Sequence, residues 1–121
     1  MEAYRYEFAD AELETLARVI SDLFPEQTSF AGRTQDDSAT ELVVQWIAMR
    51  FGSTARRMVL TVRFTPAAYA RYRAMPPRGR ARSFAVLRAF VEAELGSLEE
   101  RYANGETVPR EATIELGDEF A

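Results

Sequence analysis

Two neighbouring segments of the chain carry the hydrophobic pattern of β-strands. Residues 41–51, ELVVQWIAMRF, are dense in β-branched and aromatic side chains, and residues 58–64, MVLTVRF, alternate between two sets of side chains. A period of two places successive side chains on opposite faces of a strand. The link Gly52-Ser53-Thr54-Ala55 has the composition and length of a hairpin turn. We therefore expect 41–51 and 58–64 to pair as an antiparallel hairpin.

Two segments combine a helical spacing of apolar residues with helix-end signals. The first helix is expected over 10–24, because Asp10 is a favourable N-cap residue and Pro25 stops the helix. The second is expected over 66–75, where Thr65-Pro66 supplies a cap and a proline for the first turn.

A third and longer helix is expected over 82–103. It lies between a break at Pro76-Pro77-Arg78-Gly79 and the C-cap pair Asn104-Gly105. Its apolar positions cover more than half of the helix circumference, namely Phe84, Val86, Leu87, Phe90, Val91, Ala93, Leu95, Leu98 and Tyr102. A helix with so wide an apolar surface is expected to be buried on two sides, either by its own domain or by a second copy of the chain.

Three aromatic residues are candidate interface anchors, because aromatic side chains dominate binding hot spots. Phe90 and Tyr102 belong to the wide apolar surface of the third helix. Trp46 lies within an apolar strand, where a core position is favoured, and it becomes an anchor only if its side chain is exposed.

The order of these elements predicts one α+β domain over residues 1–121, with a small antiparallel sheet packed against about three helices. Short edge strands are expected in Tyr4–Phe8, where aromatic and charged residues alternate, near Phe30, and in Thr113–Leu116. The length of 121 residues is sufficient for one hydrophobic core.

The composition excludes several kinds of chemistry. The chain has no cysteine and no histidine, and all fifteen basic residues are arginine. Thiol nucleophiles, thiolate and imidazole metal ligands, and lysine Schiff bases are therefore absent. Adjacent acids such as Glu99 and Glu100 point in different directions on a helix, and Asp36-Asp37 lacks the spaced ligands of a calcium loop. We expect a non-catalytic protein with no cofactor and no metal.

Charge is strongly sorted along the chain. Ten arginines and no carboxylate lie between Glu41 and Glu92, whereas residues 1–41 hold ten acids against three arginines and residues 92–121 hold nine against two. This sorting predicts either ion pairs between distant segments or a basic face that is open to an anionic partner. If the segments pair, stability should fall with moderate salt and with acidification toward about pH 4.

Residues 59–95 run from the strand at 59–64 through the Thr65-Pro66 cap and a short helix to a glycine-containing break and a second helix. In this order and spacing they locally resemble the ribbon-helix-helix module of small bacterial repressors. The resemblance implies a dimer whose paired strands read DNA through Val59, Thr61 and Arg63. It also implies that the start of the second helix, near Arg82 and Ser83, holds a phosphate, with further backbone contacts from Arg56, Arg57, Arg78 and Arg80.

A second resemblance rests on the block MVLTVRFTPAAYARYRAMPPRGRARSF and on the overall length of the chain. On these features the chain as a whole resembles members of a small bacterial family described only as a domain of unknown function. It implies no activity, cofactor or partner.

The sequence also bears on where the protein is located and on two hypotheses for its function. No apolar run approaches the roughly 20 residues of a membrane span, and the N-terminus lacks a secretory signal, so a cytoplasmic protein without membrane attachment is expected. The first hypothesis is a non-catalytic interaction protein that binds an unknown protein or itself. The second is a ribbon-helix-helix-like DNA-binding dimer, which requires strand 58–64 to pair with its twin and not with 41–51.

Overall fold

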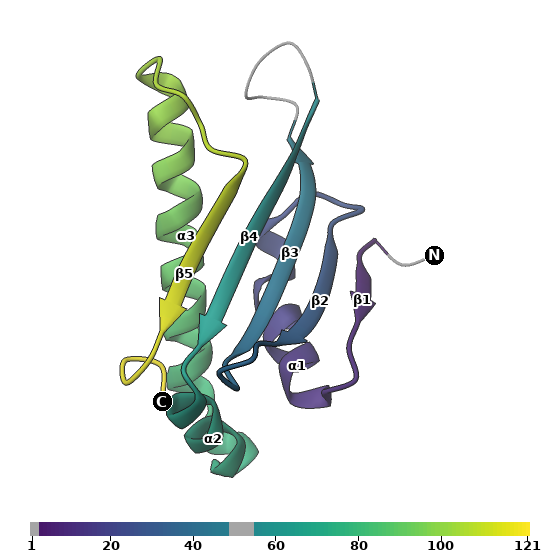
Figure 1. Cartoon of the computed structure of the whole chain (residues 1–121), viewed down its shortest axis with the longest axis vertical. Helices are drawn as coiled ribbons and strands as arrows, with labels where there is room; N and C mark the ends of the chain where they lie inside the picture. Colours follow the sequence, from purple (N-terminus) through teal and green to yellow (C-terminus); the bar gives the residue numbers. More distant parts are fainter. Residues whose placement is uncertain (1–2, 49–54) are drawn as a thin grey trace.

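A mixed β-sheet forms the centre of the molecule (Figure 1). The computed structural model describes residues 3–48 and 55–121, and within them the sheet has five strands in the order β1-β2-β3-β4-β5. The strands are β1 (Arg5–Glu7), β2 (Ser29–Thr34), β3 (Thr40–Ala48), β4 (Arg56–Phe64) and β5 (Glu111–Leu116).

The predicted hairpin is confirmed for its described part. β3 and β4 pair antiparallel, with Leu42 opposite Val62 and Val44 opposite Leu60. This register places the apolar set of each strand on the same face, as the period of two requires. Gly52, Ser53 and Thr54 of the predicted turn and residues 49–51 of the predicted strand lie outside the described residues.

The prediction of a small antiparallel sheet was only partly right. β2, β3 and β4 form an antiparallel meander, but β1 pairs parallel to β2 and β5 pairs parallel to β4. Parallel neighbours need a crossover connection, and helices supply both crossovers here. The short strands expected at the edges are present as β1 and β5, whereas the strand near Phe30 is a six-residue strand inside the sheet.

The three expected helices are present with small changes at their ends. α1 spans Ala11–Ile20, with Asp10 as its N-cap, and continues into a 3₁₀ turn at Ser21–Leu23. α2 spans Pro66–Ala74, and the Thr65 hydroxyl accepts a hydrogen bond from the backbone N–H of Ala68. The Pro-Pro-Arg-Gly break contains a second 3₁₀ turn.

α3 spans Ala81–Ala103, with Asn104 as its C-cap. Gly105 follows with a φ of 77°, the left-handed conformation that glycine adopts readily. Only one side of this helix is buried within the chain, through Ser83, Leu87, Val91 and Leu98. Phe90 lies on the other side and is 41% exposed. The expected burial on two sides is therefore not provided by residues 3–48 and 55–121, and burial by a second copy stays a prediction.

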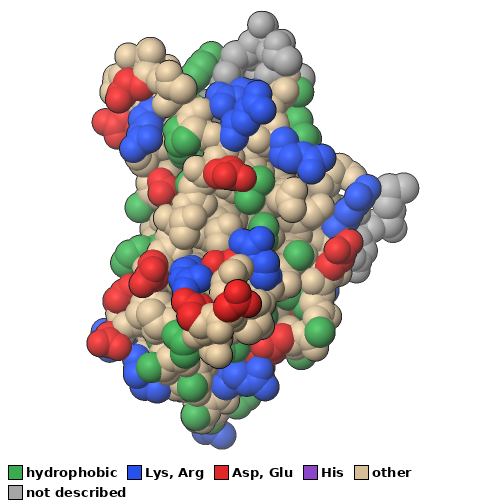
Figure 2. Space-filling view, viewed as in Figure 1, with side chains coloured by type: hydrophobic (Ala, Val, Ile, Leu, Met, Phe, Trp, Pro, Cys, Tyr) green, Lys and Arg blue, Asp and Glu red, His purple; other side chains and the backbone are tan. Residues whose placement is uncertain are grey.

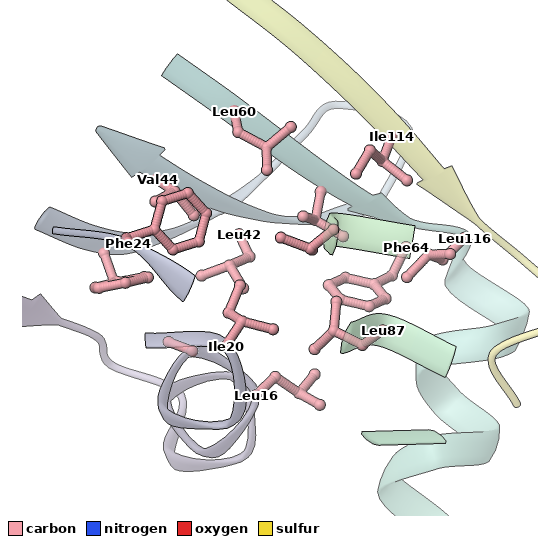
Figure 3. Packing of buried hydrophobic residues seen from close by; sticks show 14 of the residues in the cluster. Leu16, Ile20, Phe24, Leu42, Val44, Leu60, Phe64, Leu87, Ile114 and Leu116 are labelled. Atoms are coloured by element: carbon pink, nitrogen blue, oxygen red, sulfur yellow. The ribbon is translucent and has the colours of Figure 1, made fainter. Parts of the chain in front are cut away.

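The buried hydrophobic residues form one cluster between the sheet and the helices. Leu16 and Ile20 of α1 face Leu42 of β3, and Leu87 of α3 faces Phe64 of β4 (Figure 3). These side chains are fully buried, so removing them from water supplies much of the free energy of folding. The helices lie on one side of the sheet, and the other side remains uncovered by any described helix (Figure 1).

Candidate functional site

The uncovered side of the sheet, here called the open face, is the candidate site. It consists of the side chains that alternate with the core positions of the five strands. From β1 to β5 these are Arg5, Glu7, Ser29, Ala31, Arg33, Glu41, Val43, Gln45, Ile47, Arg57, Val59, Thr61, Arg63, Glu111, Thr113 and Glu115. Residues that lie opposite one another on neighbouring strands form rows across this face, and each row has its own chemistry.

One end of the open face is a row of alternating charges, Arg33, Glu41, Arg63 and Glu115, which are in register across β2, β3, β4 and β5. The Glu41 side chain is only 8% exposed. Its carboxylate accepts hydrogen bonds from Arg33 Nε at 2.7 Å, Gln35 Nε2 at 2.7 Å and Arg63 Nη1 at 3.1 Å. Asp37 completes the row with an ion pair to Arg63. We call this set the charge row.

The charge row holds the Glu41 carboxylate in the ionised form. Burial alone would raise the pKa of Glu41, but the hydrogen bonds from Arg33, Gln35 and Arg63 outweigh it and lower the pKa below the ordinary value of 4.5. The hydrogen bond to Glu41 raises the pKa of Arg63 in turn. This end of the open face is therefore electrostatically satisfied and offers little to an anionic ligand.

Glu41→Gln should lower stability at neutral pH by about 1–2 kcal/mol, because charge-assisted hydrogen bonds are lost. A lowered pKa in the folded state stabilises the protein above the ordinary value and ceases to do so as the pH falls through the folded pKa. The wild-type free energy of unfolding should therefore decline below about pH 4.5 more steeply than that of the variant. Urea denaturation at a series of pH values measures this. Glu111→Gln is the matched control and should keep the wild-type slope, and equal slopes for all three proteins would contradict the prediction.

The opposite end of the open face is basic. A hollow of about 190 Å³ is lined there by Arg5, Gln27, Ser29, Gln45, Trp46, Ile47 and Arg57. We call it the basic hollow. The Arg57 guanidinium donates to Gln45 Oε1 at 3.4 Å, and neither Arg5 nor Arg57 pairs with a carboxylate among the residues described. Figure 2 shows basic side chains gathered over the upper ends of β3 and β4, and mixed charges below them.

An apolar cleft of about 490 Å³ adjoins the basic hollow. It lies between the end of α1, the end of β3 and the second half of α3. Its lining includes the apolar side chains of Leu23, Phe24, Pro25, Leu95 and Leu98, together with the acidic residues Asp22 and Glu99. The cleft and the hollow share Trp46 and Ile47. Ile47 is 50% exposed, whereas Trp46 is 8% exposed and packs on Phe24 with ring centroids 5.0 Å apart. The exposed isoleucine thus separates a polar hollow from an apolar one.

The arginines that the sequence singled out do not form one surface. Arg63 belongs to the charge row, and Thr61 lies in the middle of the open face but is buried, with an exposure of 9%. Arg56 donates to the backbone carbonyl of Val108 at 2.8 Å. Of the predicted anion contacts, Arg57 alone lines the basic hollow. Sequence reasoning missed Arg5, Gln27 and Gln45, whose only sequence signal is a polar side chain at an outward strand position or a turn.

The start of α3 differs most from the prediction. Arg78 and Arg82 are exposed, but Arg80 is 8% exposed and Ser83 is 1% exposed. The Ser83 hydroxyl donates to the backbone carbonyl of Phe120 at 2.7 Å. Arg80 and Ser83 are therefore buried structural residues and are not available to a phosphate.

The three predicted anchors also have different places. Trp46 is a core residue that forms part of the wall of two hollows. Phe90 is exposed on α3, and Tyr102 is 46% exposed near the end of that helix.

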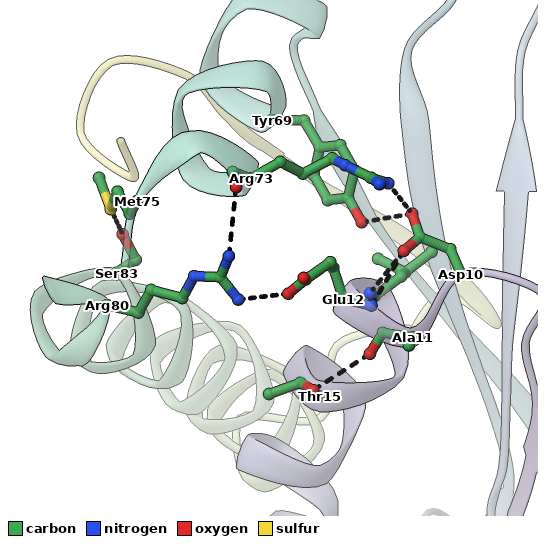
Figure 4. A network of polar contacts seen from close by, with 10 residues as sticks. Asp10, Ala11, Glu12, Thr15, Tyr69, Arg73, Met75, Arg80 and Ser83 are labelled. Atoms are coloured by element: carbon green, nitrogen blue, oxygen red, sulfur yellow. Dashed lines mark hydrogen bonds and ion pairs between the residues drawn. The ribbon is translucent and has the colours of Figure 1, made fainter. Parts of the chain in front are cut away.

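A polar cluster joins the starts of α1 and α3 to α2 (Figure 4). Asp10 accepts hydrogen bonds from the backbone N–H of Glu12 at 2.9 Å and from the Tyr69 hydroxyl at 2.7 Å, and Arg73 Nη1 lies 3.0 Å from the same carboxylate. Arg80 pairs with Glu12. Burial raises the pKa of Tyr69, and its hydrogen bond to Asp10 adds to that effect, so the hydroxyl stays protonated. The cluster fastens helices together.

Many of the charges that are segregated along the sequence form ion pairs with one another inside the chain. The predicted pairing of the basic middle with the acidic flanks is confirmed for Arg63 with Asp37, Glu41 and Glu115, Arg71 with Asp118, Arg73 with Asp10, Arg80 with Glu12, and Arg88 with Asp22 and Glu92. In the part of the chain that the structure describes, no group of three or more acidic side chains is arranged to hold a metal ion. No helix there is both long and apolar enough to cross a bilayer.

The fold defines an α+β protein whose mixed sheet carries helices on one face, while no described helix covers the other face. The chain belongs to the family described as Protein of unknown function (DUF3022), whose model matches residues 13–117. The predicted membership of a domain-of-unknown-function family is thereby confirmed. No curated protein and no solved structure matches the chain.

Proposed function

We propose that this protein is a non-catalytic binding module that receives a protein partner on the open face. The observation that carries the proposal is a five-stranded sheet with an uncovered face of mixed character. Val43 and Val59 are half-buried in the middle rows of this face, and Ile47 is exposed at its basic end, beside the basic hollow. An apolar centre with polar surroundings is the arrangement common to protein–protein interfaces.

The location of the charges supports a protein partner over DNA. Five of the nine described arginines in the basic middle are already paired with carboxylates of the flanks, so these five contribute little to the binding of a polyphosphate. β4 pairs with β3 on one side and with β5 on the other, so it has no free edge for a twin strand. The ribbon that the DNA-binding hypothesis requires therefore has no strand to form it.

The composition supports a non-catalytic role. The chain lacks the imidazole, thiol and primary side-chain amine groups that most nucleophilic and general-base mechanisms use. The best-buried carboxylate of the open face, Glu41, is held by three donors and is not free to move a proton.

Site-specific photo-crosslinking in the organism that encodes the protein tests the proposal. A photoreactive amino acid placed at Val43 or Thr113 should give a discrete crosslinked adduct with a partner, because both positions lie on the open face. The matched control is Ala89, an exposed position on α3. Adducts at Ala89 equal to those at the other two positions, or no adduct at either open-face position, would count against the proposal.

A further inference from the structure

We infer that the basic hollow binds an acidic side chain of the partner, with a bulky apolar side chain of the same segment seated in the adjoining apolar cleft. The inference rests on the proposed function, because it names the chemistry of the segment that meets one end of the open face.

The lining of the basic hollow is a set of donors for an anion. It contains two guanidinium groups (Arg5, Arg57), two amides (Gln27, Gln45) and one hydroxyl (Ser29), and no carboxylate. Arg5, Ser29 and Gln45 share one cross-strand row, and Arg57 lies opposite Ile47, two residues further along β3. Guanidinium groups bind carboxylates through paired N–H donors.

The two arginines differ from the other arginines of the open face, Arg33 and Arg63, in having no carboxylate partner among the described residues. Arg33 and Arg63 on the same face both pair with Glu41, whereas Arg5 and Arg57 pair with no carboxylate of a described residue. An approaching anion therefore does not have to displace an existing ion pair. Gln27 lines the same hollow from a turn with φ of 73°, a conformation uncommon for a residue other than glycine.

The size and surroundings of the hollow favour one carboxylate over a nucleic acid. Its volume of about 190 Å³ accommodates a single acidic side chain. Glu7 lies two residues after Arg5 on β1 and on the same face of the sheet. Glu111 of β5 lies opposite Val59, so carboxylates lie on two sides of the basic hollow. They would repel the successive phosphates of a nucleic acid, whereas a lone carboxylate between them is tolerated.

The apolar cleft supplies the second half of the recognition. It shares Ile47 and Trp46 with the basic hollow, and Leu95 and Leu98 form its far side. A peptide that crosses Ile47 can therefore place an acidic side chain on one side and an apolar side chain on the other. Burial of that apolar side chain would add to the charge-assisted hydrogen bonds.

Titration with capped peptides of alternating glutamate and leucine tests the inference. Trp46 is the one tryptophan of the chain and lines both hollows, so its fluorescence is the readout, with calorimetry as a second measure. We expect the glutamate peptide to bind about tenfold or more tightly than the same peptide with glutamine. Arg5→Gln and Arg57→Gln should each weaken binding by about tenfold, whereas Arg78→Gln, the same substitution at an exposed arginine elsewhere, should leave it unchanged.

Several results would overturn the inference. These are absence of binding by the glutamate peptide, equal affinity of the glutamine peptide, or equal effects of the Arg57 and Arg78 substitutions. If random-sequence duplex DNA at low salt displaced the bound glutamate peptide as strongly as unlabelled glutamate peptide does, the basic hollow would be a nucleic-acid site instead. If crosslinks from Val43 persist while Arg57→Gln leaves peptide affinity unchanged, the inference fails and the proposed function stands. Absence of crosslinks from both Val43 and Thr113 would contradict the proposed function itself.

Discussion

Replacement of Phe120 by alanine is expected to lower the free energy of unfolding by about 3–5 kcal/mol, the usual cost of truncating a buried phenylalanine. Phe120 is 2% exposed. Its ring lies 4.8 Å from that of Phe64 and 5.3 Å from that of Tyr72, measured between centroids, so it packs against both β4 and α2. Its backbone carbonyl accepts the hydrogen bond from Ser83 at the start of α3.

Phe90→Ala is the matched control, because the same side chain is removed from an exposed position on α3. Its cost should stay below about 1 kcal/mol, since little apolar surface returns to water. Urea denaturation of both variants gives the comparison. Similar losses for the two would show that Phe120 does not join the core as described, or that the outer side of α3 is covered in solution.

Arg80→Ala is expected to cost about 2–3 kcal/mol, somewhat less than the loss of one partner from a fully buried ion pair, because the Glu12 side chain is 34% exposed. Arg80 pairs with Glu12, donates to the backbone carbonyl of Arg73 at 3.3 Å and lies 4.5 Å from the centre of the Tyr72 ring. Its removal leaves a carboxylate and a carbonyl without their donor and the ring without its cation.

A double substitution separates the charge from the packing. Arg80→Met with Glu12→Gln removes both charges and keeps an apolar side chain on Tyr72, so it should cost less than Arg80→Ala alone. Arg78→Ala, at an exposed arginine two residues away, should change stability by less than about 0.5 kcal/mol. These values come from chemical denaturation at neutral pH. A loss no larger for Arg80→Ala than for Arg78→Ala would contradict the structural role assigned to Arg80.

The elements that sequence reasoning predicted well are those defined by local signals. The period of two in 58–64, the Asp10 cap and the Asn104-Gly105 end all act within a few residues, so a short window contains them. For Ser29–Thr34, the sequence predicted only a short strand near Phe30, because the Gly, Ser and Thr residues of this segment favour a loop. Pairing with β3 over its whole length overrides that preference, as tertiary context often does in strands.

The parallel neighbours and the site were less accessible to sequence reasoning, because both depend on distant segments. Nothing near Glu111 indicates that it will stand opposite Val59. The basic hollow likewise draws Arg5, Gln27 and Arg57 from three segments, and only the last was proposed as an anion contact. The sorted charges predicted ion pairs between middle and flanks, but the sequence did not indicate which arginines would remain unpaired.

The parallel pairing of β4 with β5 has a consequence for how the polypeptide acquires its shape. The β2-β3-β4 meander joins segments that are close in sequence, so it can form early. The edge of β4 that faces away from β3 is paired only after residues 111–116 have been synthesised as β5. The connection to β5 also requires α3 to pack against the sheet. Until then an unpaired, largely apolar strand is exposed, and such edges promote aggregation of nascent chains. Arg56, Arg57 and Arg63 along that strand would keep newly made chains apart by mutual repulsion.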